Sequence, residues 1–392
     1  MNVDVIWIEN DYPFNSPFLR NKYIGLSKSF KAVLVHYGYK RGPNEVPNIR
    51  VPSAPLSLLL VLLIRIVFNP LSTLKFISVL KKRNRGKWLK KLILDAVFIG
   101  HKVKLIHFEF GTMALGRMYL GEALNCKILV SFRGYDINYF SLGKDSVFTE
   151  IWENASSLHF LGNDLRNRAI KRGCPEELNY CTISPAIDLN LFIRGEESSW
   201  DSSINRVKQR GGIKLISVGR LVWKKGYEYA ILAVKALIDA GYQLEYRIIG
   251  QGNHKEAIEF MIRELGLQNH IKLLGGLPQK EIVKEMNTAD LFLHPAISEG
   301  FCNAVIEAQA LGLPVITTYA DGLRENIEEG ETGFAVPVCD YQLLAEKIEM
   351  FIQSPDLIKE FGSKGIRRAK TYYNLEDQIS KFSNVYNQLI NG

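Results

Sequence analysis

The sequence predicts an α/β protein built from two doubly wound domains with parallel sheets. Short apolar runs alternate with amphipathic helical stretches along most of the chain, which is the pattern of strand–helix–strand units. Several of these runs end in glycine or in charged residues, as expected where loops at the carboxyl ends of parallel strands hold a ligand. The length of 392 residues suits two domains better than one.

The composition is that of an ordinary globular protein, with 47% hydrophobic and 23% charged residues. The cysteines lack the paired spacing of a zinc site or a disulfide framework, so we expect a reducing compartment. They are Cys126, Cys174, Cys181, Cys302 and Cys339. The first residues lack a basic region and a cleavage site, so we expect no signal peptide and a cytoplasmic protein.

Positive charge is concentrated in the first half of the chain. Residues 1–185 hold 26 Lys and Arg against 14 Asp and Glu, a net charge of +12, whereas residues 186–392 hold 23 against 27, a net charge of −4. No nucleic-acid recognition motif accompanies the basic half. An anionic membrane surface is therefore the better candidate partner.

The first domain is expected to contain five strands, at residues 3–8, 31–37, 103–108, 127–132 and 157–160, and helices at 113–124 and 163–171. The loop after the first strand ends with Asn15 and Ser16. Ser16 can cap a helix that has Pro17 at its first position. This loop should line the cleft between the domains; the alternative is a capping loop that contacts no ligand.

An unusual segment interrupts this alternation. Residues 56–68 are almost unbroken aliphatic sequence, and residues 75–91 carry eight basic residues and no acidic one. A membrane span needs about 20 apolar residues, so the apolar run is too short to cross a bilayer. We expect peripheral contact with an anionic membrane. The alternative is that residues 58–68 pack on the sheet while the lysines are solvated.

The second domain begins near Pro185, and residues 195–211 are expected to form a linker or an exposed helix. Its first strand leads into Gly219-Arg220 and then Lys225-Gly226. Cations clustered at the end of a strand repel each other unless an anion lies between them, so these residues suggest an anion-binding site. The alternative is an ordinary surface loop that binds no ligand. A later strand ends in Gly250-Gln-Gly252, where glycine permits a close backbone approach.

Residues 289–317 predict a strand, a loop, a helix over 301–311 and another strand. The loop delivers Gly300 and the amides of the helix start, a suitable place for an anion. Glu299 precedes the helix and Glu307 lies on it. A carboxylate beside an anion site can accept hydrogen bonds from neutral hydroxyls. An anion site next to such a carboxylate therefore suggests a ligand in which a sugar is joined to a phosphate. Alternatively, one glutamate is a cap and the other a surface residue.

Two glutamates separated by seven residues, with a proline-containing loop before them and Ala-x-Ala-x-Gly-x-Pro-Val-Ile after them, resemble the retaining glycosyltransferases of family 4. This family has the GT-B architecture, two Rossmann-like domains that face each other across a cleft. The resemblance implies an N-terminal acceptor domain over residues 1–185 and a C-terminal nucleotide-sugar domain over 186–371. It also implies a last helix, 372–392, that crosses back to the first domain.

The resemblance also assigns site residues. Arg220 and Lys225 would neutralise the leaving diphosphate, Glu299 would bind the donor sugar, and Glu307 would bind the ribose. With these two cations nearby, both carboxylates are expected to be ionised. Further donor contacts are implied for Gly219, Gly250, Gly252, Gly300, Phe301, Cys302 and Asn303. Acceptor contacts are implied for Asn15, Ser16, Tyr135 and Asp136.

Arg133-Gly-Tyr-Asp136 departs from the family, which has His-Gly-x-Asp at this place. Arg133 could hold a phosphate or an anionic acceptor at the reaction centre, or it could simply pair with Asp136. His107 matches a frequent family position, but a histidine in an apolar strand is more often a core residue.

We therefore expect a metal-independent glycosyltransferase without a cofactor. The donor would be a nucleotide sugar, a UDP-sugar rather than a GDP-sugar, and the acceptor a saccharide or polyprenyl-linked saccharide in bacterial surface polysaccharide synthesis. The protein would be cytoplasmic, at the inner face of the cell membrane. The alternatives are an epimerase or phosphorylase of the same fold and a non-catalytic sugar-nucleotide-binding protein.

Overall fold

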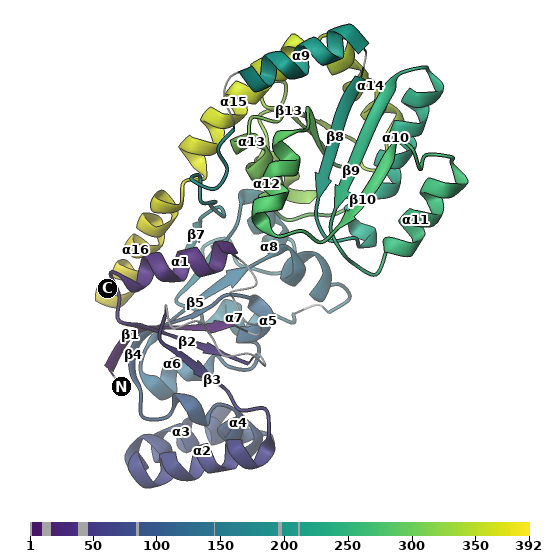
Figure 1. Cartoon of the computed structure of the whole chain (residues 1–392). Helices are drawn as coiled ribbons and strands as arrows, with labels where there is room; N and C mark the ends of the chain where they lie inside the picture. Colours follow the sequence, from purple (N-terminus) through teal and green to yellow (C-terminus); the bar gives the residue numbers. More distant parts are fainter. Residues whose placement is uncertain are drawn as a thin grey trace. The chain divides into compact units, whose positions relative to one another are not determined.

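The computed structural model describes residues 2–9, 17–37, 46–83, 86–144, 146–194, 198–210 and 212–392, which Figure 1 shows as a ribbon. The chain divides into two compact units. Unit 1 comprises Met1–Ser184 together with Glu376–Gly392, and unit 2 comprises Pro185–Leu375. The sequence analysis placed the domain boundary near Pro185.

Unit 1 is built on a parallel sheet of seven strands in the order β3-β2-β1-β4-β5-β6-β7. Its central strands are buried along most of their length, as in sheets covered by helices on both faces. The strands are β1 (Asn2–Glu9), β2 (Ala32–His36), β3 (Asn48–Arg50), β4 (Lys102–Phe108), β5 (Lys127–Phe132), β6 (Ser157–Phe160) and β7 (Tyr180–Thr182).

The helices of unit 1 follow the predicted pattern with one correction. A single helix was expected over 113–124, but the chain forms α5 and α6 instead, because Gly116 has φ +67°, which an α-helix cannot contain. The helices are α1 (Pro17–Ser27), α2 (Pro55–Phe68), α3 (Pro70–Arg83), α4 (Trp88–Leu94), η2 (Ala96–Phe98), α5 (Gly111–Ala114), α6 (Tyr119–Leu124), the π-helix η3 (Tyr135–Phe140), α7 (Thr149–Asn154) and α8 (Asn163–Ile170).

Unit 2 contains a parallel sheet of six strands in the order β10-β9-β8-β11-β12-β13. The strands are β8 (Gly212–Val218), β9 (Gln243–Ile249), β10 (Ile271–Gly275), β11 (Leu291–His294), β12 (Val315–Thr318) and β13 (Gly333–Val336). With unit 1, this confirms the prediction of two doubly wound parallel sheets.

The helices of unit 2 pack against both faces of its sheet. They are α9 (Ser198–Arg210), η4 (Trp223–Lys225), α10 (Tyr227–Asp239), α11 (Lys255–Glu264), α12 (Gln279–Asn287), α13 (Asn303–Ala310), η5 (Asp321–Asn326), α14 (Tyr341–Gln353) and α15 (Asp356–Tyr372). Within the stretch expected to be a linker or an exposed helix, α9 buries Trp200, Ile204 and Val207 in the core. It is therefore a packed helix of unit 2.

The C-terminal helix α16 (Leu375–Asn391) packs on unit 1. Its Phe382, Tyr386 and Leu389 lie in the same core cluster as Trp7. The Tyr386 hydroxyl accepts a hydrogen bond from Trp7 Nε1 at 2.9 Å and lies 2.6 Å from His107 Nδ1. The last helix of the chain is thus tied to the first strand of the first sheet.

We predict that Tyr386→Phe lowers the free energy of unfolding of unit 1 by about 1–3 kcal/mol, because it leaves the buried Trp7 N–H without its acceptor. Chemical denaturation followed by fluorescence measures the loss. Tyr372→Phe is the matched control, since Tyr372 is 61% exposed and its substitution should leave stability unchanged. Equal stability of all three proteins would contradict this account of how α16 is anchored.

Candidate functional site

The carboxyl ends of β8 and β11 meet at the centre of the sheet in unit 2. From β8 the chain continues to β9 on one side, whereas from the neighbouring β11 it continues to β12 on the other. The connections after these two strands thus run in opposite directions, and ligands bind at such switch points in open α/β sheets. The loops after the two strands are joined directly, because Ile297 N donates to Lys224 O at 2.8 Å. Residues far apart in the sequence are thereby brought to one place.

Lys225 and Glu299 form a largely buried ion pair at this switch point. Lys225 is 8% exposed, and its Nζ also lies 3.4 Å from His294 Nε2. Asp321 positions the loop that carries Glu299, since its Oδ2 accepts a hydrogen bond from Glu299 N at 3.0 Å. The site therefore has a cation and a carboxylate in direct contact, held by loops from both strands.

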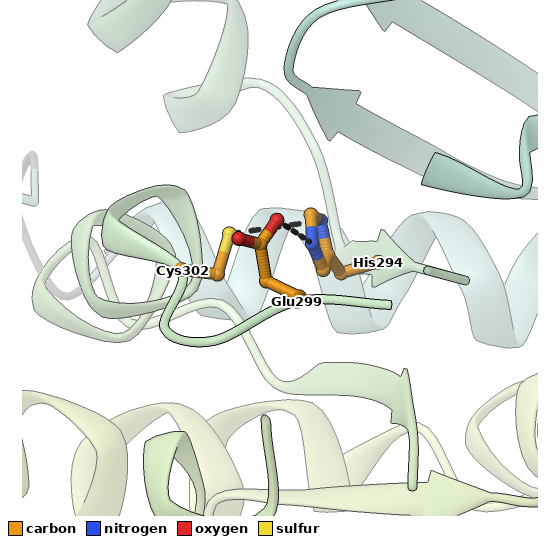
Figure 2. Close-up of side chains that lie close together, drawn as sticks. All are labelled: His294, Glu299 and Cys302. Carbon is orange, nitrogen blue, oxygen red and sulfur yellow. Dashed lines mark hydrogen bonds and ion pairs between the residues drawn. The ribbon is translucent and has the colours of Figure 1, made fainter. Parts of the chain in front are cut away.

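His294, Glu299 and Cys302 lie close together (Figure 2). Cys302 Sγ is 3.7 Å from His294 Nδ1, and His294 Nε2 is 3.8 Å from Glu299 Oε2. These residue types can ligate a metal. However, the Lys225 ammonium already contacts the Glu299 carboxylate, so a metal ion would have to displace a buried cation. The expectation of a metal-independent site stays a prediction.

Opposite charges determine the ionisation of Glu299. Burial would raise the pKa of this carboxyl, but Lys225 and His294 outweigh it and hold the pKa at about 2. Burial likewise opposes the charged form of Lys225, while Cys302 and Glu299 favour it, and its pKa is raised. The expectation that Glu299 is ionised agrees with these shifts.

Glu307 differs from Glu299, and one expectation about it is wrong. We expected nearby cations to keep it ionised, but burial raises its pKa to about 7. It lies in the second turn of α13 and is partly buried. Near neutral pH this carboxyl is therefore divided between its protonated and ionised forms.

Arg220 lies at the exposed rim of the same site. Its charge acts on both Lys224 and Lys225 and disfavours their charged forms. Glu299 and Asp321 act on Lys224 in the opposite sense. Three cations thus stand against two carboxylates, and the excess positive charge suits an anion.

The glycines of the strand ends have a packing role. A Cβ on Gly250 would lie 1.8 Å from Gly219 O, and one on Gly252 would lie 2.0 Å from Leu221 O. The loop after β9 can therefore hydrogen-bond to the loop after β8, as in Leu221 N to Gln251 O at 2.9 Å. The close approach that glycine allows here is to the protein's own backbone, while contact with a donor stays a prediction.

Some of the residues before α13 contact other parts of the protein and are less available to a ligand. Cys302 is buried, and its N–H donates to Asn326 Oδ1 at 3.2 Å, so this amide is not free to bind a ligand. Phe301 packs on Tyr373, with ring centroids 5.9 Å apart. Gly300 and Asn303 are partly exposed, which leaves them as the better candidates for donor contact.

Unit 1 holds a second ionic cluster at the switch point of its own sheet, where β1 lies between β2 and β4. Glu109 follows β4, is fully buried, and forms ion pairs with Lys22 of α1 and with Arg133, the latter at 3.0 Å. Arg133 Nε also donates to Glu109 O at 3.1 Å. Burial opposes the charge on Glu109, but Lys22 and Arg133 lower its pKa.

Glu9 completes the cluster at the end of β1. It is 5% exposed and accepts a hydrogen bond from the Tyr23 hydroxyl at 3.0 Å. Burial and the nearby Glu109 charge raise its pKa to about 8. With Glu9 protonated at neutral pH, two cations, Lys22 and Arg133, face one carboxylate, so this cluster also carries an excess positive charge.

Asp136 supports a loop by accepting hydrogen bonds from backbone amides, while the Arg133 side chain pairs with Glu109. The two oxygens of Asp136 accept hydrogen bonds from the Thr112 and Arg133 amides, at 3.0 and 2.9 Å, and Asp136 is fully buried. Direct contact between Asp136 and an acceptor is therefore a prediction without structural support. Tyr135 is 56% exposed, whereas Asn15 and Ser16 lie outside the described residues.

His107 is a satisfied core residue, as expected. It is fully buried, and its two ring nitrogens lie 2.6 Å from the Tyr386 hydroxyl and 2.7 Å from Ser131 Oγ. Burial lowers its pKa well below the ordinary value.

Sequence reasoning missed Glu9, Lys22, Glu109 and the grouping of His294 with Cys302. For Glu9 and Glu109 a signal was present, because each directly follows a predicted strand, where ligand-binding side chains gather. For Lys22, inside a helix, the sequence offers no such signal.

Residues 199–368 match the family described as Glycosyl transferases group 1. The chain is 28% identical over 274 residues to the amylovoran biosynthesis glycosyltransferase AmsK of Erwinia amylovora, which covers 66% of this chain and 65% of that protein. It is 33% identical over 268 residues to WcaL of Escherichia coli, named for colanic acid biosynthesis, covering 66% of this chain and 61% of that protein. The matched region thus spans less than two thirds of each relative.

Solved structures share the fold over nearly the whole chain. Anabaena Alr3699/HepE, in complex with UDP, superposes with a TM-score of 0.76 at 17% identity, covering 98% of this chain and all of that one. Sucrose-phosphate synthase of Thermosynechococcus elongatus gives 0.73 at 19% identity, covering 99% of each chain. The fold class is therefore that of the GT-B proteins, with two Rossmann-like domains.

The ionic cluster of unit 1 yields a prediction about stability. Glu109→Gln should lower the free energy of unfolding by about 3–5 kcal/mol, because Lys22 and Arg133 then stay buried with less opposing charge. Lys22→Met combined with Glu109→Gln should lose less than the sum of the single variants, measured by chemical denaturation as a double-mutant cycle. Strict additivity would show that the pair is not energetically coupled.

Proposed function

We propose that this chain is a retaining glycosyltransferase of family 4 that moves a sugar from a nucleoside diphosphate to a saccharide. The observation that carries the proposal is the contact between Lys225 and Glu299 at the switch point of unit 2. A cation suits a phosphate and a carboxylate suits sugar hydroxyls. Their direct contact fits a ligand in which the sugar is bonded to the phosphate.

The family match of residues 199–368 supports this reading, as do the names of the relatives. Because the HepE structures hold UDP and UDP-glucose, we infer a UDP-sugar donor in preference to a GDP-sugar. Because AmsK and WcaL are named for amylovoran and colanic acid biosynthesis, we infer an acceptor of bacterial surface polysaccharide synthesis.

The acceptor would be a glycan or a saccharide carried on a polyprenyl lipid, and the enzyme would work in the cytoplasm at the inner face of the cell membrane. The exposed Tyr135 and the positively charged cluster around Arg133 are the features of unit 1 that suit such an acceptor. We expect no metal or cofactor, because Arg220 and Lys225 would supply the positive charge that neutralises the diphosphate.

Electrostatic stabilisation would supply most of the rate enhancement. As the bond between sugar and phosphate breaks, negative charge builds on the leaving diphosphate, and Arg220 and Lys225 would neutralise it. Lys225 is held in place beforehand by Glu299 and His294, so little reorganisation is needed. For retention, the departing phosphate would take the proton of the attacking hydroxyl on the same face of the sugar.

An assay with UDP-sugars and GDP-sugars, a lipid extract as the source of acceptors and analysis of the products tests the proposal. Transfer with retained anomeric configuration is the expected result. Interconversion of the free sugar nucleotide would favour an epimerase. Phosphorolysis of a glycan would favour a phosphorylase, and donor binding without turnover would favour a non-catalytic binding protein. Each of these three results would overturn the proposal.

The diphosphate clamp makes a kinetic prediction. Arg220→Ala and Lys225→Ala should each raise the activation barrier by about 2–4 kcal/mol, as the loss of a charge-stabilising group does in other enzymes. Steady-state kinetics measures the effect. Lys370→Ala is the matched control, because this exposed lysine of α15 lies outside the charged cluster, and it should lose far less. Parental turnover in either clamp variant would remove the role assigned to that residue.

The two glutamates should have separable effects. Glu299→Gln is expected to depress kcat strongly while UDP still binds, because contacts to the distorted sugar matter most in the transition state. Glu307→Gln should weaken UDP and donor alike, by about 1.5–3 kcal/mol, the value of a hydrogen bond to a charged group. Calorimetry with UDP, with the exposed Glu346→Gln as control, measures this difference.

The pKa of Glu307 adds a pH dependence to the same experiment. Ionisation above a pKa of about 7 makes this carboxyl a better acceptor for ribose hydroxyls. UDP affinity of the parent, relative to Glu307→Gln, should therefore rise as pH increases through 7. If Glu299→Gln instead loses UDP affinity and Glu307→Gln keeps it, the proposed orientation of the donor is reversed.

A further inference from the structure

An extended apolar surface covers helices α2 and α3. Ten large apolar side chains on these two helices are between 42% and 82% exposed. They are Leu56, Leu59, Leu60, Leu63, Ile64, Ile66, Val67, Phe68, Leu71 and Leu74. With Leu89 of α4 they make up eleven of the twenty exposed large hydrophobic side chains found among the described residues. A contiguous patch of this kind marks an interaction surface.

Only a narrow face of α2 packs against the rest of unit 1. Leu58 and Leu62, one turn apart, are buried, and Arg65 on the same face lies 3.3 Å from Val97 O. The opposite face carries Leu56, Leu60, Leu63 and Val67. The alternative that residues 58–68 simply pack on the sheet is therefore wrong for most of their side chains. Figure 1 shows α2, α3 and α4 gathered below the strands of unit 1.

The charge around this surface identifies its partner. Residues 46–94 contain ten Lys and Arg and no Asp or Glu. Lys81 and Lys82 end α3 and are exposed, as are Lys87 and Lys90 nearby. A second copy of this chain would bring the same positive charge and repel the first. An apolar interior bordered by negative charge is the chemistry of an anionic bilayer.

The lengths of α2 and α3 determine whether these helices could span a bilayer or would lie in its interface. Within the described part of the chain, no single helix is long and apolar enough to cross a membrane, and α2 and α3 pass that test only together, with a bend of 118° between them. Each has 14 residues, about 21 Å of helix, against a hydrocarbon core of about 30 Å. A bent pair of this size suits the plane of the interface.

A basic pocket adjoins the apolar surface. Lys75 lies one turn after the exposed Leu71 on α3 and lines a pocket of about 630 Å³ together with Lys31, Lys102 and Lys104. Asp4 also lines this pocket and pairs with Lys104 at 2.9 Å, so the lysines outnumber the one carboxylate. Exposed apolar side chains and an ammonium group are therefore neighbours on one helix. This arrangement matches the boundary between the acyl chains of a bilayer and its phosphates.

We propose that α2 and α3 form a lipid-docking surface that inserts Leu60, Leu63 and Val67 into the interface of an anionic bilayer while the surrounding lysines contact lipid phosphates. This deepens the proposed function by naming the surface that meets the membrane, and it depends on that function only for the lipid-linked acceptor. The residues of the surface are separate from those assigned to sugar transfer.

Co-sedimentation of the full chain with vesicles tests the proposal. The parent should bind phosphatidylglycerol vesicles and bind phosphatidylcholine vesicles far more weakly. Leu60→Ser/Leu63→Ser/Val67→Ser should weaken binding to phosphatidylglycerol on the order of 100-fold, through loss of apolar burial. Lys81→Gln/Lys82→Gln should weaken it about 30-fold, and raised salt should reduce the binding of the parent.

Matched variants elsewhere control for general effects. Ile193→Ser/Phe260→Ser removes side chains of similar exposure, 65% and 66%, and Lys280→Gln/Lys370→Gln removes two exposed charges of unit 2. Both controls should bind vesicles like the parent. Because all the substituted side chains are exposed, thermal unfolding should be unchanged, which verifies that each variant is folded.

Three results would overturn the docking surface. These are equal vesicle binding by parent and triple variant, binding of the parent to neither kind of vesicle, and a dimer of the parent that the triple variant abolishes in sedimentation velocity. The last would assign the surface to a second copy. Vesicle binding without sugar transfer would refute the proposed function alone, and sugar transfer without vesicle binding would refute the docking surface alone.

Discussion

The largely buried ion pair between Lys225 and Glu299 is the interaction on which the candidate site of unit 2 depends. Burying two charges costs several kcal/mol per ion before their attraction offsets it, so such a pair is weak evidence of stabilisation. The position of the ion pair between two loops explains its presence better than a contribution to stability does. The pair connects the loop after β8 with the loop after β11. His294 lies next to Lys225, and Asp321 accepts a hydrogen bond from the Glu299 amide.

Unit 1 repeats this arrangement with different residues. In each sheet the first and fourth strands of the unit lie side by side at the switch point, β1 with β4 and β8 with β11. In each unit the cation comes from the segment that follows the first strand, as Lys22 or Lys225, and the carboxylate follows the fourth strand, as Glu109 or Glu299. The same topology therefore brings a buried lysine into contact with a glutamate twice, with Glu109 fully buried and Glu299 partly buried.

The two pairs differ in what surrounds them. Lys225 and Glu299 have the exposed Arg220 at their rim, which leaves positive charge open to an anion in solution. Glu109 instead holds Arg133, the residue that departs from the family pattern, through both its carboxylate and its carbonyl oxygen. The departure at Arg133 is thus accompanied by a buried acidic partner, which explains how a large cation is tolerated there.

The sequence by itself determined the two parallel sheets, because buried strands and amphipathic helices have distinct periodicities. It also made Glu299, Arg220 and Lys225 candidate site residues, through their places near strand ends and through the family resemblance. Only the tertiary structure showed that Lys225 contacts Glu299, that Glu109 holds Arg133, and that burial raises the pKa of Glu307 to about 7. The physical reason is that ion pairing and desolvation depend on how segments far apart in the sequence pack together. Lys225 and Glu299 are 74 positions apart and Lys22 and Glu109 are 87 apart, whereas periodicity and spacing report only on neighbours along the chain.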